Sequence, residues 1–232
     1  MLRKFASHLK RTPLHPQWLL GKRKVPSGLK NIQGLILDIG AADRWIEKYL
    51  SATANYIALD YPATGQNMYG AKPSVFADAA QLPFKDEQFD AIVCLEVIEH
   101  VPNPQQVLNQ ISRTLKKGGQ VWLSMPFLYP LHDAPFDFQR FTEYGLRRSA
   151  TIAGLEVVRL RKSEHSIQTA GLLACLAVAG GAYAAKGWLK YLYLIPAIFI
   201  ITIINLASWL LSLIWPDWQH MSHGYSILLK KS

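Results

Sequence analysis

Acidic residues are missing from the first part of the sequence. No Asp or Glu occurs before Asp38, yet the same stretch holds nearly enough basic residues to account for the net charge of +9 of this 232-residue chain. The remainder of the chain is therefore close to neutral. Such a basic arm suits an anionic surface, either a membrane or a nucleic acid, unless it is simply a solvated terminus. The basic residues are Arg3, Lys4, Lys10, Arg11, Lys22, Arg23, Lys24 and Lys30.

Cysteine is almost absent as well. Cys94 and Cys175 lie far apart in apolar surroundings, so they provide neither a disulfide framework nor the spacing of a metal site. We therefore expect a reducing compartment and no bound metal. The first residues also lack the long apolar run of a secretory signal.

Short apolar runs alternate with helical stretches from Leu35 onward. This alternation predicts an α/β fold with a mostly parallel sheet flanked by helices. The expected helices are Arg44–Leu50, Pro104–Leu115 and Thr142–Ala153, and the Lys116–Gly119 turn ends the second of them. The expected strands are Leu35–Gly40, Tyr56–Asp60, Ser74–Ala77, Ala91–Glu96, Gln120–Met125, Leu155–Leu160 and, last, Gly224–Leu229.

Two long apolar runs interrupt this pattern after the sixth expected strand. Ser166–Ala185 and Tyr191–Trp215 each approach or exceed the roughly 20 residues that cross a bilayer. Tyr and Trp residues gather at both ends of the pair, as at membrane interfaces. We predict a membrane hairpin between the sixth and seventh strands. The alternative is a buried hairpin within a dimer or a large core, and Lys186 and Lys190 in the link favour an interfacial over a spanning hairpin.

The first strand ends in a turn that could hold a nucleoside. A glycine directly after a strand allows close approach of a ligand, and the next helix offers free N–H groups; Asp38 and Gly40 stand at this point. Asp60 ends the second strand about 20 positions later, where an acid can bind ribose hydroxyls. By itself this pattern is common.

A series of further motifs carries a family resemblance. The stretch Val75–Val101, "VFADAAQLPFKDEQFDAIVCLEVIEHV", resembles the class I S-adenosylmethionine-dependent methyltransferases of the small-molecule "methyltransferase type 11" group. "LKKGGQVWLSMP" and "FDFQRFTEYGLRRSATIAGLEVV" are similar to later segments of that family. The resemblance covers roughly residues 34–160 and the last strand. It implies a Rossmann-like seven-stranded sheet and S-adenosyl-L-methionine as cofactor.

The resemblance also implies roles for single residues. Asp38 and Gly40 match the motif that holds the methionine part of the cofactor. Asp60 matches the acid on the ribose, with Tyr61 beside the adenine. The adenine edge would be bound by Asp78 with Ala79, and Leu95 would line the methyl group. For each of the acids, the alternative is a turn or cap residue.

This sequence departs from the family in the glycine turn. Where the family has D-x-G-x-G-x-G, the second and third glycines are replaced by Ala42 and Arg44. Alanine is tolerated there if its φ is negative and is unfavourable if the turn requires a positive φ.

Methyl transfer needs mainly alignment of the acceptor, plus a base where the acceptor loses a proton. His132 is the candidate base, and Asp133 or Asp137 could orient it. The alternative is a histidine satisfied in a polar loop. His100 is interpreted as structural, and Tyr129 and Arg140 are further candidates on the substrate side.

Together these features predict an enzyme that methylates a lipophilic or lipid-linked acceptor at a membrane. Because the hairpin joins the sheet at the edge where ligands of such folds bind, we expect the site to face the lipid, with the catalytic domain on the cytoplasmic side. The expected parts are a basic arm (1–30), a methyltransferase domain (31–162 and 222–232) and a membrane hairpin (163–221). The alternatives are a non-catalytic membrane scaffold and an RNA methyltransferase, although no RNA-binding module is recognisable and nucleic acid is not expected as a partner.

Overall fold

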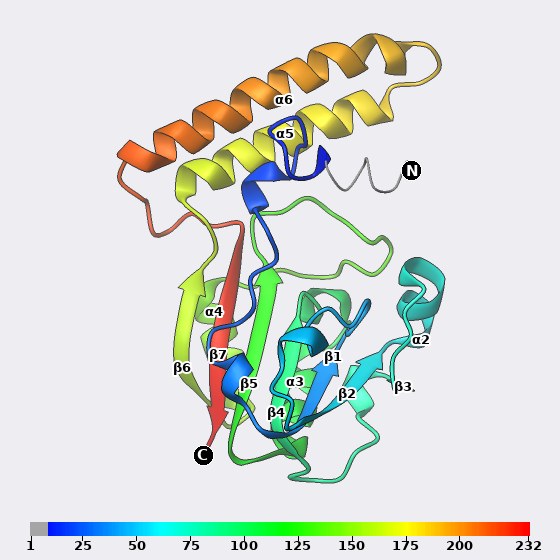
Figure 1. Cartoon of the computed structure of the whole chain (residues 1–232), viewed down its shortest axis with the longest axis vertical. Helices are drawn as coiled ribbons and strands as arrows, with labels where there is room; N and C mark the ends of the chain where they lie inside the picture. The colour runs from blue at the N-terminus through cyan, green and yellow to red at the C-terminus, as the bar shows by residue number, and fades with distance from the viewer. Residues whose placement is uncertain (1–8) are drawn as a thin grey trace. The chain divides into compact units, whose positions relative to one another are not determined.

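The computed structural model describes residues 9–232 and contains a seven-stranded sheet in the order β3-β2-β1-β4-β5-β7-β6 (Figure 1). The five strands β3, β2, β1, β4 and β5 are parallel to their neighbours in this order, and β7 pairs antiparallel with β5. The predicted Rossmann-like, mostly parallel sheet is confirmed, as is the helical hairpin between the sixth and seventh strands. The strands are β1 (Gly34–Ile39), β2 (Ala54–Asp60), β3 (Val75–Phe76), β4 (Phe89–Leu95), β5 (Leu115–Pro126), β6 (Leu155–Lys162) and β7 (Gly224–Lys231).

The described chain divides into two compact units. The sheet unit comprises Lys24–Phe127, Leu131–Arg161 and Gly224–Ser232. The hairpin unit comprises Lys162–His223, Leu128–Pro130 and the described N-terminal residues up to Arg23. Of the predicted basic arm, Arg3 and Lys4 lie outside the described residues.

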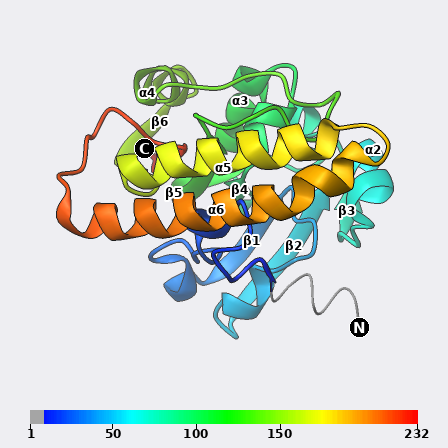
Figure 2. The same cartoon turned by 90° about the horizontal axis from the view of Figure 1, so that it is seen from above.

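Two helices, α3 (Pro104–Thr114) and α4 (Glu143–Ile152), cover one face of the sheet (Figure 2). Both begin at an N-cap that the sequence marks: Asn103 accepts the N–H of Gln106, and Thr142 accepts the N–H of Gly145. The remaining helical segments of this unit are short turns: η2 (Leu29–Asn31), η3 (Glu47–Tyr49), α2 (Pro62–Thr64), η4 (Gly65–Tyr69), η5 (Ala79–Gln81) and η6 (Ile98–His100).

Alternating side chains of the strands form two hydrophobic layers, as the pleat requires. On the helix side, Ile92 and Cys94 of β4 pack in one cluster with residues of α3 and α4. On the other side, Val93 packs with Trp122 and with Leu29 of η2. The indole N–H of Trp122 donates to the carbonyl of Ser27, which attaches the segment before β1 to this face.

The predicted helix Arg44–Leu50 is wrong. Only a single 3-10 turn, η3, forms there, because Ala42 and Arg44 both adopt a positive φ that interrupts a right-handed helix. The segment Lys116–Gly119 does follow the end of α3, but it forms a bulge within β5, with Gly118 at φ +76°, so β5 starts earlier than predicted.

The hairpin unit contains the two longest helices, α5 (Ser166–Ala184) and α6 (Leu189–Ile214), which run side by side (Figures 1 and 2). Both are long and apolar enough to cross a membrane by length and composition alone. The unit also holds η1 (Trp18–Leu20) and Tyr129, whose hydroxyl accepts a hydrogen bond from Gln17.

Candidate functional site

The turn after β1 requires glycine at its first position. Gly40 has φ +72°, and a Cβ built on it would overlap Cγ2 of Val97. The N–H groups of Gly40 and Ala41 both donate to the carbonyl of Leu59, at 2.9 and 3.0 Å. The backbone at this point is thus fixed and carries no Cβ of its own, which is a condition for close approach of a ligand.

Ala42 and Arg44 stand where the family's motif has its second and third glycines, and both have left-handed backbone angles. Ala42 has φ 44° and Arg44 has φ 55°. Each costs about 1–2 kcal/mol relative to glycine in this left-handed region. Arg44 offsets part of that cost, because it pairs with Glu47 at 2.9 Å and stacks over the ring of Tyr56. The turn therefore has left-handed backbone angles at the two positions where the family that the sequence resembles has glycine.

Asp38 is buried at the end of β1 and accepts a hydrogen bond of 2.5 Å from the hydroxyl of Tyr56. Burial raises the pKa of Asp38 to about 7, although the hydrogen bond from Tyr56 acts in the opposite direction. The pKa of Tyr56 is raised as well, first by burial and then by the charge of Asp38. Asp38 therefore changes charge near neutral pH, next to the turn.

Asp60 connects the end of β2 to the glycine turn. Its two carboxylate oxygens accept the N–H of Ala42 and the N–H of Tyr61, each at 2.8 Å. Burial raises the pKa of Asp60, against the effect of these two donors. Each oxygen still has a second lone pair for a further donor. The side chain of Tyr61, next along the chain, is exposed.

The other predicted cofactor residues lie at the ends of the neighbouring strands. Asp78 follows β3; its exposed carboxylate caps η5 by accepting the N–H of Ala80 at 2.8 Å, and Ala79 is buried behind it. Leu95 is half-buried at the carboxyl end of β4. In parallel sheets ligands bind along this edge. The cofactor roles of all these residues remain predictions.

The candidate base His132 is held by Asp137 rather than by Asp133. Nδ1 of His132 lies 3.2 Å from Asp137, and Arg140 donates to the same carboxylate at 2.8 Å. Arg140 holds the pKa of Asp137 well below its usual range. Asp133 faces another ring, that of His100, with its oxygen 3.8 Å from Nε2. An ionised, positioned acceptor beside His132 suits a histidine that takes up a proton.

A buried carboxyl on η6 lies near these histidines, and sequence reasoning missed it. Glu99 is fully buried, and neither of its oxygens has a hydrogen-bond partner. Burial raises its pKa to about 9, so it is protonated at neutral pH. Nδ1 of His100 donates to the carbonyl of Phe136 at 2.9 Å. The other ring nitrogen, Nε2, lies 3.6 Å from a carboxyl oxygen of Glu99. The "EVIEH" run was a usable signal, because an acid followed by histidine after a buried strand places both at the ligand edge.

Glu99, His100 and His132 also form a set that could hold a metal. One ligand atom from each lies within 4.8 Å of the others. Two imidazoles and a carboxylate are donors that divalent transition metals accept. No metal-ligand spacing indicates this set in the sequence, because His132 lies more than 30 positions from the other two.

Comparison with known proteins places this geometry in a family. Residues 37–123, which include the end of β1, the glycine turn, Asp60 and Asp78, match the family described as a methyltransferase domain. This part of the chain is a class I S-adenosylmethionine-dependent methyltransferase domain. This methyltransferase is 49% identical over 61 residues to the ubiquinone biosynthesis O-methyltransferase of Dechloromonas aromatica, and 30% identical over 122 residues to that of Pseudomonas syringae.

These matches cover only parts of the proteins concerned. They span 26% and 48% of this chain, and 25% and 50% of the two relatives, so the chain spans about half or less of the curated relatives it matches. Among solved structures, a methyltransferase from Methanosarcina mazei has TM-score 0.50 at 15% identity, covering 85% of this chain and 92% of that chain. The [4+2]-cyclase SpnF has TM-score 0.53 at 16% identity, covering 88% and 78%. At such identities the likeness concerns the fold alone.

Proposed function

We propose that this protein transfers a methyl group from S-adenosyl-L-methionine to a lipophilic or lipid-linked acceptor at a membrane surface. The observation that carries the proposal is the insertion of two long, exposed apolar helices between β6 and β7 of a methyltransferase sheet. The relatives in ubiquinone biosynthesis support a hydroxyl acceptor on a prenylated ring. The division into basic arm (1–30), methyltransferase domain (31–162 and 222–232) and membrane hairpin (163–221) is part of this proposal.

The strand topology supports this proposal, because the chain connections to the hairpin lie at the same edge of the sheet as the predicted cofactor residues. Gly224, the first residue of β7, pairs with Pro126, the last residue of β5, so β7 starts at the carboxyl edge of the parallel strands. β6 points the same way as β5 (Figure 1), so the chain also leaves the sheet at this edge. Gly40, Asp60 and Leu95 end or follow strands at the same edge.

The residues of the glycine turn and strand ends fit the cofactor. Asp38 and Gly40 would hold its methionine part, Asp60 and Tyr61 its ribose and adenine, Asp78 with Ala79 the adenine edge, and Leu95 the region of the methyl group. When bound, S-adenosyl-L-methionine supplies an electrophilic methyl group. The protein aligns the acceptor, and His132 accepts the hydroxyl proton while ionised Asp137 stabilises the resulting imidazolium. Asp133, opposite His100, is assigned to the acceptor side of the same loop.

Cofactor binding tests the first part of this proposal. Calorimetric titration of the full chain with S-adenosyl-L-methionine should show binding that Asp78→Ala weakens at least tenfold. Asn103→Ala is the matched control, since it removes a similar helix cap without touching the predicted cofactor site. No binding at millimolar cofactor would favour the non-catalytic scaffold instead.

Acceptor chemistry tests the second part. Mass spectrometry of lipids and quinones from cells with and without the chain should reveal a species that gains one methyl group. With that acceptor, His132→Ala should lower kcat by about 10²–10⁴-fold, the usual contribution of a general base. Strong salt-dependent RNA binding with no lipid product would support the RNA methyltransferase alternative.

A further inference from the structure

We propose that α5 and α6 lie in the plane of one leaflet of an anionic membrane and do not cross it. The reason is that hydrogen bonds and side-chain packing hold residues 9–20 along one side of the helix pair. The inference rests on the membrane association proposed above and adds the orientation. All the contacts that carry it lie within the hairpin unit.

The fastening centres on Asn205, a fully buried polar residue in the middle of an apolar helix. Its Nδ2 donates to the carbonyls of Pro13 and His15 at 2.7 and 3.0 Å. Its Oδ1 lies 3.4 Å from the thiol of Cys175 on α5. One amide therefore joins both helices to the N-terminal segment, and its burial makes loss of any of these partners costly.

Close packing extends the contact along both helices. Gly171 of α5 faces Ser208 of α6 so closely that no Cβ would fit, and Leu19 packs onto the same point. The rings of Trp18 and Trp209 have centroids 6.5 Å apart. The N-terminal segment runs beside α5 in Figure 1.

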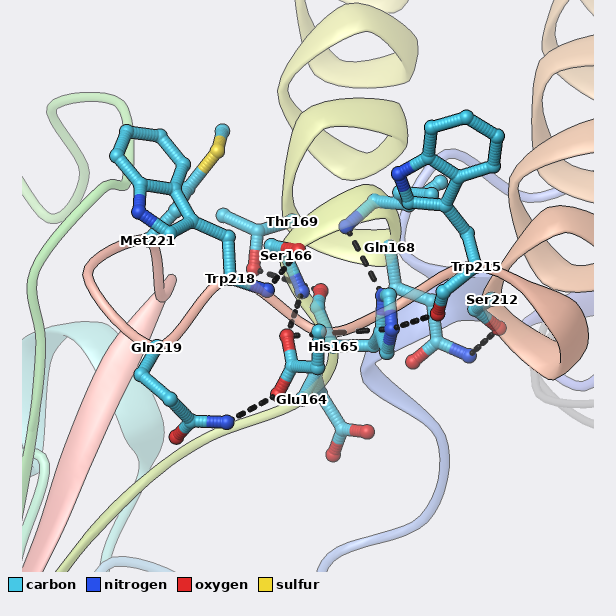
Figure 3. Close-up of polar contacts among 12 residues, drawn as sticks. Glu164, His165, Ser166, Gln168, Thr169, Ser212, Trp215, Trp218, Gln219 and Met221 are labelled. Carbon is cyan, nitrogen blue, oxygen red and sulfur yellow. Dashed lines mark hydrogen bonds and ion pairs between the residues drawn. The ribbon is translucent and has the colours of Figure 1, made fainter.

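Polar contacts also close the base of the hairpin (Figure 3). His165 caps α5 and approaches the carbonyl of Trp215 at 3.1 Å, and Gln168 donates to Ser212 at 2.8 Å. The two helices thus form a fixed pair at this end.

A spanning arrangement would bring the fastened segment into hydrocarbon. α5 has 19 residues, about 28 Å at 1.5 Å per residue, so it would need its full length to cross a core about 30 Å thick. Gly171 and Cys175 would then lie well inside the core, together with the irregular backbone at 13–19 that packs beside them. Bilayers exclude such backbone where lipid can reach it. Lys10 and Arg11, both exposed and directly before that segment, would follow it inward at a high cost.

An in-plane arrangement gives each side of the helix pair a suitable environment. The uncovered surface consists of large apolar side chains such as Ile195, Phe199 and Leu210, which would enter the acyl boundary. Tyr183 and Trp188 near the turn, and Trp215 and Trp218 at the base, would all lie at headgroup level. On the fastened side, the exposed Lys10, Arg11, Lys22 and Arg23 would meet anionic headgroups.

Accessibility of the hairpin turn tests this orientation. Lys22→Cys and Lys186→Cys are made in the full chain, and the parent with its two buried cysteines gives the background labelling. A membrane-impermeant maleimide is applied to inverted vesicles and to spheroplasts. We expect both added cysteines to be labelled in inverted vesicles and neither in spheroplasts. Labelling of Lys186→Cys from the spheroplast exterior overturns the proposal.

Vesicle flotation tests the surface itself. Phe199→Asp should weaken binding to phosphatidylglycerol vesicles at least tenfold, and Ile152→Asp, at a comparably exposed apolar position on α4, should not. Unchanged binding of Phe199→Asp, or equal binding to purely zwitterionic vesicles, contradicts the proposal. If labelling and flotation agree with it but no lipid is methylated, only the proposed reaction fails.

Discussion

At the scale of single residues, the glycine turn is defined by backbone angles more than by residue type. Gly40 cannot be replaced, because both its φ and its contact with Val97 exclude a Cβ. Ala42 and Arg44 occupy left-handed angles that glycine adopts more easily. Alanine is unfavourable in this turn if its φ is positive, and the φ of Ala42 is positive. The strain stays local, since Asp60 accepts the N–H of Ala42 and holds the turn in place.

Ala42→Gly should therefore stabilise the protein. We expect a gain of about 0.5–1 kcal/mol in the free energy of unfolding, since relief of the left-handed angle exceeds the extra flexibility of glycine in the unfolded chain. Ala41→Gly is the control; Ala41 is buried and has no positive φ, so its loss should destabilise. Denaturant titration of both variants measures the difference, and a destabilised Ala42→Gly would contradict this interpretation of the turn.

Glu99 should give the protein a stability that falls as pH rises. Its folded pKa of about 9 lies above the unfolded value of 4.5, so the folded state holds a proton that the unfolded state loses between these values. The contribution of Glu99 to the free energy of unfolding is therefore greatest below pH 4.5. Between pH 4.5 and pH 9 this contribution declines by at most about 1.4 kcal/mol per pH unit.

Glu99→Gln should remove this dependence and be the more stable protein at pH 9. Unfolding titrations of both proteins from pH 5 to 9 in chelator check this, and parallel slopes would contradict it. Repeating them with Mg²⁺, Mn²⁺ or Zn²⁺ tests the metal-binding capacity of Glu99, His100 and His132. A bound cation would keep Glu99 ionised and flatten the slope of the unmodified protein.

At the scale of secondary-structure elements, caps and periodicity predicted more than local turns did. The starts of α3 and α4 follow from Asn103 and Thr142, and the seven strands follow from apolar runs. The helix expected after β1 does not form, because hydrogen bonds from residues 40–42 to Leu59 and Asp60 of β2, which no local pattern encodes, hold the turn. Buried Asn205 is another such case, since its partners lie about 190 positions away.

Asn205→Ala should release the N-terminal segment from α6. The change leaves two backbone carbonyls without their donor, at a cost of about 1–3 kcal/mol. We expect faster tryptic cleavage at Lys10 and Arg11, which limited proteolysis in detergent measures. Thr202→Ala is the matched control on the same helix, because its hydroxyl bonds only to the carbonyl of Ile198. Equal cleavage of the two variants would show that the segment is held by other contacts.

At the scale of the whole molecule, the hairpin is an insertion that the sheet does not need for its own pairing. β7 pairs with β5 from Gly224 to Lys230, all but its last residue, and β6 lies beside β7. Replacing residues 166–220 by a short linker should give a soluble protein that still binds S-adenosyl-L-methionine in calorimetry and methylates its lipophilic acceptor at least tenfold more slowly. Full activity of this variant would contradict a lipid-dependent reaction.

The sequence alone determined the α/β class, the succession of strands along the chain, the inserted hairpin and the resemblance to the methyltransferase family, because periodicity and ordered motifs are local properties of the chain. Tertiary structure decided which acid meets which histidine. It placed Asp137 beside His132 and Asp133 beside His100, and it buried Glu99 near His100 with no hydrogen bond to its carboxyl oxygens. It also fastened residues 13–19 to α5 and α6. These arrangements depend on contacts between segments distant in the chain, which only the folded backbone brings together.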